Sequence, residues 1–427
     1  MSDGLMLVGI GLLALMGAPL FAVILALAML GFWAQGVDLS VIGVEMYRTT
    51  DTALLLAIPL FTFAGFVLSE SRTSERLVAV CRALMGWMPA GLAVVALMAC
   101  ALFTAFTGAS GVTIVALGAL LYPALQHARY DAKFSLGLVT AGGSLGLLLP
   151  PALPLILYAI IASQSEAARG VTVESMFIAG LLPSAIMLGL LALYAVWANR
   201  NSQVERSAFR WKDVRQALLA ARWEIPLPAV VLGGIYSGWI AVSEAAALSA
   251  LYVLLIEVFV YREVKLNQLP RITADAMVMV GGILVILAVS LAFTNYLVDA
   301  EVPMQLLDWL NAHVHSPLLF LLMLNGFLLV LGAILDIFSA IIIVVPLLIP
   351  VGAAFGIHPV HLGIVFLANM QIGYLTPPVG MNLFIASLRF KKPLGEIVQV
   401  SLPFIGVLLL ALALITYIPW LSLVFVE

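Results

Sequence analysis

Apolar stretches long enough to cross a bilayer recur from one end of the chain to the other, and they leave few folds open to it. Runs of about 18 or more apolar residues are typical of transmembrane helices. Of the 427 residues, 64% are hydrophobic and 10% are charged, whereas about a quarter of a soluble domain is charged. We therefore predict an all-α polytopic membrane protein. The net charge of −3 gives no reason to expect a nucleic-acid partner.

The basic residues predict how the chain is oriented. Loops rich in Lys and Arg stay on the cytoplasmic side of a membrane. Five loops hold most of these residues and are predicted to be cytoplasmic, namely 69–88, 125–134, 198–222, 261–272 and 389–395. The connections 295–315 and 351–361 contain no Lys or Arg, so we expect them outside.

The apolar segments between these loops must fit the same orientation. Residues 89–124 begin and end inside, and residues 316–350 begin and end outside, so each forms either two spans or a hairpin. Residues 135–162 cross outward and residues 362–388 cross inward. The stretch 5–33 is long for one upright helix and short for two, and the sequence leaves its path open.

The chain contains an internal repeat. Residues 146–151 read Gly-Leu-Leu-Leu-Pro-Pro, and residues 373–378 read Gly-Tyr-Leu-Thr-Pro-Pro, an offset of 227 residues. Pro123 and Pro350 are related by the same offset. The order of span, loop, hairpin, broken crossing and span recurs with every direction reversed, so the two copies are inverted. Inverted repeats with interrupted helices are typical of secondary transporters.

Each Pro-Pro pair is expected to interrupt its helix. Proline lacks a backbone donor and disfavours helix at the preceding residue. The carbonyl groups freed in this way must face protein, water or a cation, because an unsatisfied group in lipid costs several kcal/mol. Carbonyl and hydroxyl oxygens suit hard cations such as sodium, whereas the N-termini of half-helices suit anions. Each break therefore supplies groups for both an ion and an anionic substrate.

Small and hydroxylated residues lie near the middle of the first hairpin, where we expect its tip at mid-depth. The stretch 103–113 reads FTAFTGASGVT. This composition also suits close packing of helices. Because Gly142, Gly143 and Ser144 precede a Pro-Pro break, we interpret the tip as a place where carbonyl and hydroxyl groups coordinate a cation.

The second hairpin carries Asp336, the one acid that lies far from either predicted membrane boundary. An acid at membrane depth is by default a candidate functional residue. Asp336 either binds a cation, orients the amides of the tip, or caps a helix and so satisfies the tip's own donors. These alternatives stay open, and the tip depends on Asp336 in each of them.

Polar side chains surround the second Pro-Pro pair, at Asn369, Gln371, Thr376 and Asn382. We interpret them as the lining of a substrate cavity, in preference to hydrogen bonding between helices. Our predicted substrate contacts from both halves are Thr107, Thr113, Ser144, Asn369, Gln371 and Asn382.

Four stretches of the chain resemble a known family of transporters: 103–118 (FTAFTGASGVTIVALG), 143–154 (GSLGLLLPPALP), 243–252 (SEAAALSALY) and 373–384 (GYLTPPVGMNLF). They are similar to the large, DctM-like membrane subunit of tripartite ATP-independent periplasmic (TRAP) transporters, and the likeness covers nearly the whole chain. The resemblance implies an inverted-repeat elevator-type transporter with two re-entrant helical hairpins and two broken helices, and not an enzyme. It places the chain in the bacterial inner membrane.

The resemblance also implies a substrate, a coupling ion and partners. The substrate would be a small carboxylate, such as a C4-dicarboxylate, sialic acid or a similar organic acid, and a sodium gradient would drive its import. A small four-span membrane subunit and a periplasmic substrate-binding protein would complete the system. The sodium ions would lie where hairpins meet breaks, one site with Gly108, Ser110, Gly146 and Pro150 and the other with Gly332, Asp336, Thr376 and Pro377.

The expected division of the chain follows the two halves. Residues 89–174 and 316–395 would form the two halves of a transport domain, each with a hairpin and a broken helix. The scaffold would consist of residues 1–88, residues 175–315 and the C-terminal helix in 396–427. Residues 69–88 and 298–315 within it would form the first and second interfacial arms, which are helices that lie along the membrane surface.

Two other functions remain as alternatives. A stand-alone sodium/dicarboxylate symporter of related fold would work without a binding protein. A membrane enzyme or channel fits less well, because the chain lacks a His-Glu-x-x-His motif and a histidine at depth to pair with Ser110. All five histidines are expected in loops.

Overall fold

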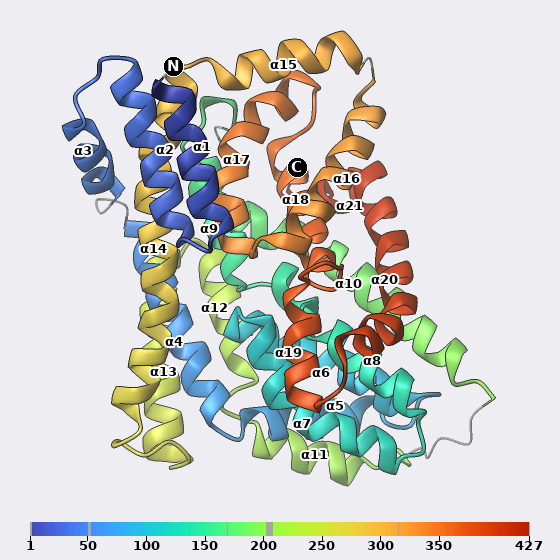
Figure 1. Ribbon diagram of the computed structural model, residues 1–427. Helices are drawn as coiled ribbons and strands as arrows, with labels where there is room; N and C mark the ends of the chain where they lie inside the picture. Colours follow the sequence, from blue (N-terminus) through green and yellow to red (C-terminus); the bar gives the residue numbers. More distant parts are fainter. Residues whose placement is uncertain (1, 50–52, 169, 202–207, 315, 427) are drawn as a thin grey trace.

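The computed structural model describes residues 2–49, 53–168, 170–201, 208–314 and 316–426. All regular secondary structure in these ranges is helical, as predicted. The predicted loop 198–222 is described except for residues 202–207. Helix α15 (Val302–His313) lies across one end of the molecule and α11 (Trp211–Ala220) across the other, with the long helices between them (Figure 1).

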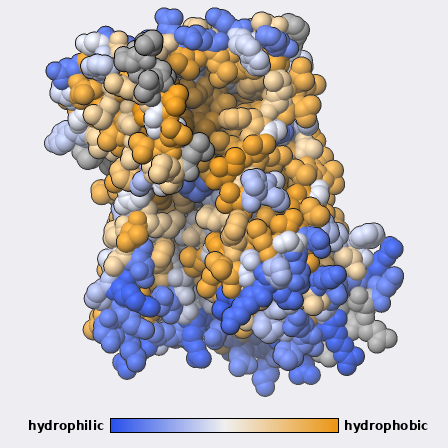
Figure 2. All heavy atoms as spheres, viewed as in Figure 1, coloured by the Kyte–Doolittle hydropathy of each residue, from blue (hydrophilic) through white to orange (hydrophobic). Residues whose placement is uncertain are grey.

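Seven helices are long and apolar enough to cross a membrane, and a bent pair of helices makes an eighth candidate in the described part of the chain. Hydrophobic side chains form a broad band around the middle of the molecule, and hydrophilic ones gather at both ends, most densely at the lower end (Figure 2). The connections after α7, α10 and α13 lie at this lower end, and α15 lies at the opposite end (Figure 1).

The first copy of the repeat contains a hairpin and a broken crossing. Its elements are α4 (Ala57–Glu70), α5 (Thr73–Met85), α6 (Gly91–Thr107), α7 (Ser110–His127), α8 (Ala132–Gly142), η2 (Leu145–Leu148), α9 (Leu153–Ala162) and α10 (Val173–Ala198). The hairpin α6–α7 enters from the lower end and turns back near the middle (Figure 1). The crossing α8–α9 bends by 41° at its break.

The second copy repeats this order from the opposite end. Its elements are α14 (Leu269–Asp299), α15, α16 (Pro317–Ile334), α17 (Ile337–Ala354), α18 (Pro359–Gly373), α19 (Met381–Phe390) and α20 (Leu394–Tyr417). Helix α7 shifted by the offset of 227 residues coincides with α17 at both ends, and α8 and α18 begin at equivalent residues. The hairpin α16–α17 enters from the upper end (Figure 1). The predicted inverted repeat is therefore confirmed.

The remaining elements surround this pair. They are α1 (Ser2–Leu15), α2 (Leu20–Ala34), α3 (Ser40–Thr49), η1 (Ala53–Leu56), η3 (Glu166–Ala168), α11, α12 (Pro226–Tyr236), α13 (Val242–Leu255), the π-helical η4 (Ile256–Val260) and α21 (Trp420–Leu423). The stretch 5–33, whose path the sequence left open, forms two short helices that pack together. With 14 and 15 residues, each is ~20 Å long at 1.5 Å per residue, too short to cross a hydrocarbon core of ~30 Å upright.

Local sequence explains where several helices begin and end. Asp131 accepts a hydrogen bond from the Phe134 backbone at the start of α8, and Thr172 forms a reciprocal cap with Ser175 at the start of α10. These side chains satisfy backbone donors that a helix start leaves without partners. The chain turns between α12 and α13, where Gly238 adopts the left-handed conformation with φ of +71°.

Candidate functional site

In both halves, the hairpin packs backbone to backbone against the break. A side chain at Gly146, in η2, would collide with the Ala101 carbonyl and the Ala105 amide of α6. A side chain at Gly373 of α18 would come 2.5 Å from the carbonyl carbon of Gly332 in α16. Gly373 and Gly332 are the equivalents of Gly146 and Ala105, so both halves make the same contact. The predicted site residues Gly146 and Gly332 thus join hairpin to break.

Hydroxyl groups connect the first hairpin to the first break. The Thr104 hydroxyl oxygen lies 2.8 Å from the Gly143 carbonyl oxygen and 2.7 Å from the Thr113 hydroxyl oxygen. Thr113, a predicted substrate contact, therefore already forms a hydrogen bond within the first half. The Thr107 hydroxyl donates to the Phe103 carbonyl one turn earlier, at 3.0 Å. Sequence reasoning missed Thr104, although it lies in the same hydroxyl-rich stretch.

The first tip holds the predicted residues Gly108 and Ser110 between α6 and α7. Gly108 ends α6 in the left-handed conformation, with φ of +65°, and packs against Leu153 at the start of α9. Ser110 is the first residue of α7, and the carbonyl oxygen of Ser110 lies beside Gly143. No side chain caps the start of α7 in the described structure.

The second tip is organised by a carboxylate. Asp336 accepts hydrogen bonds from the backbone amides of Phe338 and Ser339, both at 3.0 Å, and from the Ser339 hydroxyl at 2.5 Å. Of the roles considered for Asp336, the structure shows the helix cap. The Tyr374 hydroxyl accepts a hydrogen bond from the Ile337 amide at 2.8 Å. The sequence contained no signal for Tyr374, because a phenol in an apolar helix is usually read as packing.

One backbone hydrogen bond holds the second break to its hairpin, and a second one closes the break itself. The Gly380 amide donates to the Ala333 carbonyl at 3.0 Å, and the Asn382 amide donates to the Tyr374 carbonyl at 3.1 Å. The Thr376 hydroxyl donates to the Ile372 carbonyl at 3.1 Å, which leaves its lone pairs available. Pro150-Pro151 and Pro377-Pro378 are both cis peptides.

The two halves meet at equivalent residues. The Ser144 hydroxyl donates to the Gln371 carbonyl at 3.3 Å, and the two positions differ by the repeat offset of 227. A contact between equivalent residues lies on the two-fold axis that relates two copies. The predicted substrate contacts Ser144 and Gln371 therefore lie on the pseudo-two-fold axis between the breaks.

Several predicted site residues carry buried polar atoms without a hydrogen-bond partner. Within the described residues, these atoms are the Ser110 Oγ, the Asn369 Oδ1, the Gln371 Oε1 and both side-chain polar atoms of Asn382. Buried polar groups are almost always paired, and each exception needs an explanation. Ser110 lies at the first tip, and Gln371 and Asn382 lie on either side of the second break. Unpaired polar groups at these positions are expected of a site that receives a ligand.

Asn369 also forms hydrogen bonds between helices, the alternative to lining a substrate cavity. The side-chain nitrogen of Asn369 donates to Asn325 of α16 at 2.7 Å and to the Val365 carbonyl at 2.8 Å, so it links two helices.

One histidine does not lie in a loop, contrary to expectation. His361 is buried in α18, where its ring contacts the Ser422 hydroxyl at 2.6 Å and the Thr416 carbonyl at 3.2 Å. Ser110 is not its partner.

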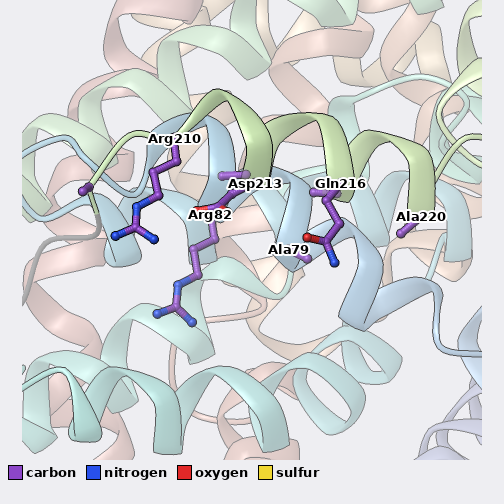
Figure 3. Close-up of a pocket in the computed structure, with 9 residues that line it drawn as sticks. Ala79, Arg82, Arg210, Asp213, Gln216 and Ala220 are labelled. Atoms are coloured by element: carbon purple, nitrogen blue, oxygen red, sulfur yellow. The ribbon is translucent and has the colours of Figure 1, made fainter.

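A cavity of about 470 Å³ lies elsewhere, between α5 and α11. Figure 3 shows Arg82 of α5 and Arg210, just before α11, extending toward the same side of this cavity, while Gln216 lies farther along α11. None of the predicted site residues lines it. The cavity is therefore separate from the hairpin tips.

Solved structures with the same fold are transporters. The chain superposes on the YdaH transporter of Alcanivorax borkumensis with a TM-score of 0.59 and 16% identity, covering 89% of each chain. It superposes on MtrF of Neisseria gonorrhoeae with a TM-score of 0.53 and 14% identity, covering 86% of this chain and 80% of MtrF. At these identities the likeness concerns the fold alone.

Curated relatives are similar in sequence over nearly their whole length. The C4-dicarboxylate TRAP transporter large permease protein DctM of Pseudomonas aeruginosa is 33% identical over 90% of this chain and 88% of its own. Its namesake from Vibrio cholerae is 31% identical over 98% of this chain and 94% of its own. The ectoine/5-hydroxyectoine TRAP transporter large permease protein UehC of Ruegeria pomeroyi is 29% identical over 96% of this chain and 95% of its own.

The family model of the DctM component of tripartite ATP-independent periplasmic transporters matches residues 6–421. With these relatives and this inverted-repeat fold, the chain belongs to the DctM family of TRAP transporter large membrane subunits.

Proposed function

We propose that this chain imports a small carboxylate across the bacterial inner membrane, driven by a sodium gradient. A C4-dicarboxylate is the first substrate to test, because relatives that are 31% to 33% identical are named for it. Sialic acid or a similar organic acid is the next. The observation that carries the proposal is the set of buried polar atoms without partners at Ser110, Gln371 and Asn382.

The helix starts at the site suit an anion. Four helices begin at the tips and breaks, namely α7, α9, α17 and α19. Helix N-termini carry partial positive charge and free amide groups, which favour carboxylates. Among the described residues, no buried side chain is Lys or Arg. The charge of a carboxylate would therefore be balanced by these N-termini, by amide side chains and by co-transported sodium.

The proposed sodium sites use oxygen atoms of both hairpins. One would combine Gly108 and Ser110 with Gly146 and Pro150, where the Ser110 hydroxyl has no protein partner. The other would combine Gly332 and Asp336 with Thr376 and Pro377. No group of three or more His, Cys, Asp or Glu side chains that could hold a metal ion occurs in the described residues. Such oxygen-rich surroundings suit a hard monovalent cation better than a transition metal.

Transport would follow an elevator mechanism in the predicted domains. Residues 89–174 and 316–395 would move together as the transport domain, because their breaks meet at Ser144 and Gln371. Residues 1–88, 175–315 and 396–427 would form the scaffold. The five basic loops would face the cytoplasm. A small four-span subunit would join the scaffold, and a periplasmic binding protein would deliver the substrate from the other side.

Reconstituted uptake tests this proposal. The chain is placed in proteoliposomes with its small subunit, the binding protein is added outside, and uptake of a radiolabelled C4-dicarboxylate is followed. Uptake should require an inward sodium gradient, and unchanged uptake after the gradient is collapsed would contradict sodium coupling. Uptake that persists without the binding protein would instead support a stand-alone symporter.

A matched pair of asparagine variants tests the site itself. Asn382→Ala removes a side-chain amide group that has no partner in the described structure. We therefore expect KM for substrate to rise about tenfold or more, the effect of losing one well-placed polar contact of about 1.4 kcal/mol. Asn199→Ala removes a buried asparagine that donates to the Ala195 carbonyl at the end of α10. Its KM should stay unchanged, and equal effects of both variants would contradict the placement of the site.

A further inference from the structure

One arginine joins helix α5 to three separate acids at the lower end of the molecule. Arg76 Nε lies 2.6 Å from Glu224, Arg76 Nη1 lies 2.5 Å from Glu263, and Arg76 Nη2 lies 3.5 Å from Glu257. Glu224 lies just before α12, Glu257 lies within η4, and Glu263 follows η4. The side chain of Glu257 is 0% exposed, that of Glu224 7%, that of Arg76 12% and that of Glu263 19%. Sequence analysis had counted Arg76 only as a loop cation.

The charges of this cluster do not balance. Three ionised carboxylates facing one guanidinium would leave two negative charges in a mostly buried place. Among the described residues, no second Lys, Arg or His forms an ion pair with Glu224, Glu257 or Glu263. Burying charge without compensation is costly, and groups in this position usually change protonation state instead.

The other groups that face the cluster add no cation. Tyr261 places its ring 4.0 Å from the Arg76 guanidinium, and its hydroxyl donates to the Ala220 carbonyl at 2.7 Å. The Arg72 backbone amide donates to Glu263 at 2.8 Å, while the Arg72 side chain pairs with Glu75. The Tyr252 hydroxyl is directed to the Trp223 carbonyl.

Counting the hydroxyl protons shows where a proton is missing. The Thr73 hydroxyl oxygen lies 2.7 Å from the Ser71 hydroxyl oxygen, 2.9 Å from Glu224 and 3.2 Å from Glu257, but it carries only one proton. The Ser71 hydroxyl lies within reach of the Leu68 carbonyl at 2.9 Å. The Thr73 hydroxyl therefore donates to at most one of the two carboxylates, and a proton on Glu257 would supply the missing donor, because a protonated Glu257 carboxyl can donate to the Thr73 oxygen.

We propose that Glu257 is a proton-binding site that holds a proton at neutral pH, and that this proton keeps α5 attached to η4 and to the segment just before α12. Glu257 is the acid that suits this role, since it is fully buried and its contact with Arg76 is the longest of the three. It also lies in the π-helical turn η4, a feature that often marks functional positions. Burial raises the pKa of the neighbouring Glu224, in spite of the opposing charge of Arg76.

The proton matters because of what α5 is connected to. Helix α5 ends at Met85 and leads through five residues into α6, the first arm of the first hairpin. Removing the proton would leave the cluster with a net charge of −2 and loosen the junction that holds this arm. The attachment of α5 should therefore weaken as the pH rises from neutral to alkaline.

Infrared spectroscopy of the purified full-length chain in detergent tests the proposal directly. The wild type should show the carbonyl stretch of a protonated carboxyl group at neutral pH, and Glu257→Gln should lack it. A wild-type spectrum without this band, or a band that remains in Glu257→Gln, would overturn the proposal. Neither result depends on transport, so a failure here is distinct from a failure of the proposed function.

Thermal unfolding supplies a second measurement. Glutamine has the shape and neutral charge of a protonated glutamate, whereas Glu257 of the unfolded wild type is ionised at neutral pH and must take up a proton on folding. The unfolding midpoint of Glu257→Gln should therefore lie at or above that of the wild type at neutral pH. As the pH rises into the alkaline range, the wild-type midpoint should fall further below that of the variant. A variant that is already much less stable at neutral pH would show that Glu257 is ionised, which contradicts the proposal.

Two further variants serve as a partner test and a control. Glu263→Gln removes one negative charge from the cluster, so Glu257 should lose its proton at a pH lower by about one unit or more. Glu70→Gln breaks the half-exposed pair between Glu70 and Arg271, which lies 2.6 Å apart and outside the cluster. That change should leave the band and its pH dependence as in the wild type, and a shift of the band would count against a local site.

Discussion

The two breaks match in sequence and in their contacts, yet they differ in exposure. At the first break, Pro150 and Pro151 are buried, and Ala152 is 0% exposed. At the second, Pro377 and Pro378 are exposed, and Val379, the equivalent of Ala152, is 44% exposed. Both breaks share the pattern Gly-x-Leu-x-Pro-Pro, so this shared pattern does not account for the difference. The difference comes from how each break sits against the rest of the chain.

This asymmetry fits the transport cycle proposed above. If two equivalent arrangements exchange in that cycle, the buried break in one state is the open break in the other. Freed carbonyl groups are not tolerated against lipid, so we expect the exposed second break to line a water-filled space. On this proposal, the present structure would be one of two states in which opposite breaks are accessible.

The largest expected contrast is in chemical accessibility. Val379→Cys should react nearly completely with a membrane-impermeant maleimide, whereas Ala152→Cys should not react in the resting protein. The reason is that a thiol must reach water to ionise and attack the reagent. Labelling is measured by a mass shift on a gel, and the unmodified chain is the control because Cys81 and Cys100 are both buried.

Adding substrate and sodium should sharpen this result. If transport exchanges the two arrangements, labelling of Ala152→Cys should increase under transport conditions and labelling of Val379→Cys should decrease. Equal labelling of both variants in the resting protein would mean that the asymmetry between the breaks is absent in the membrane.

The next largest effect concerns Gly146 and Gly373, the equivalent glycines that pack against hairpin backbone in the two halves. Gly146→Ala and Gly373→Ala each push a methyl group into hairpin backbone, and crowding of this kind costs about 1–3 kcal/mol. Both variants should lower the thermal unfolding midpoint to a similar extent and abolish uptake. Gly189→Ala in α10 is the matched control, because nothing lies within 4 Å of its added methyl group. A large loss in one half only would contradict the equivalence of the two contacts.

Much of the architecture followed from residues that are visible without a structure. The distribution of Lys and Arg placed both ends of residues 89–124 on one side and both ends of residues 316–350 on the other, and it left open whether each segment forms two spans or a hairpin. The two Pro-Pro pairs predicted the broken helices and the repeat offset. These features act through rules that are local to a segment or common to all membranes. The stretch 5–33 was left open because its two helices are shorter than the usual span.

Features that depend on tertiary contacts were not predictable. Tyr374 and Thr104 organise the tips through partners on other helices, and nothing in their own segments distinguishes them from packing residues. The cluster brings Arg76 together with three acids from two segments that lie 148 to 187 residues farther along the chain. The different exposure of the two breaks was hidden because Pro150-Pro151 and Pro377-Pro378 look alike in the sequence.

A smaller effect is expected at the second tip, where the two halves differ chemically. Asp336→Ala removes the cap of α17 and should destabilise the chain by about 1–2 kcal/mol, whereas Asp336→Asn keeps one acceptor and should cost less. The first half has no equivalent, since Ala109 occupies that position. Sodium-dependent uptake separates the two roles of Asp336. If Asp336→Asn is stable but its uptake no longer depends on sodium, the charge of Asp336 is required for sodium coupling. If uptake still depends on sodium, only the capping of α17 is required.

The smallest change is expected on the axis between the halves. The hydrogen bond from Ser144 to the Gln371 carbonyl is long, at 3.3 Å, so Ser144→Ala should alter the unfolding free energy by only about 0.5 kcal/mol. If the Ser144 hydroxyl also contacts the substrate, KM should rise several-fold while the unfolding midpoint stays nearly constant. Thr140→Val is the control, because the Thr140 hydroxyl bonds only within α8, to the Leu136 carbonyl. A fall in stability that matches the change in KM would show that Ser144 holds the two halves together and does not act on the substrate.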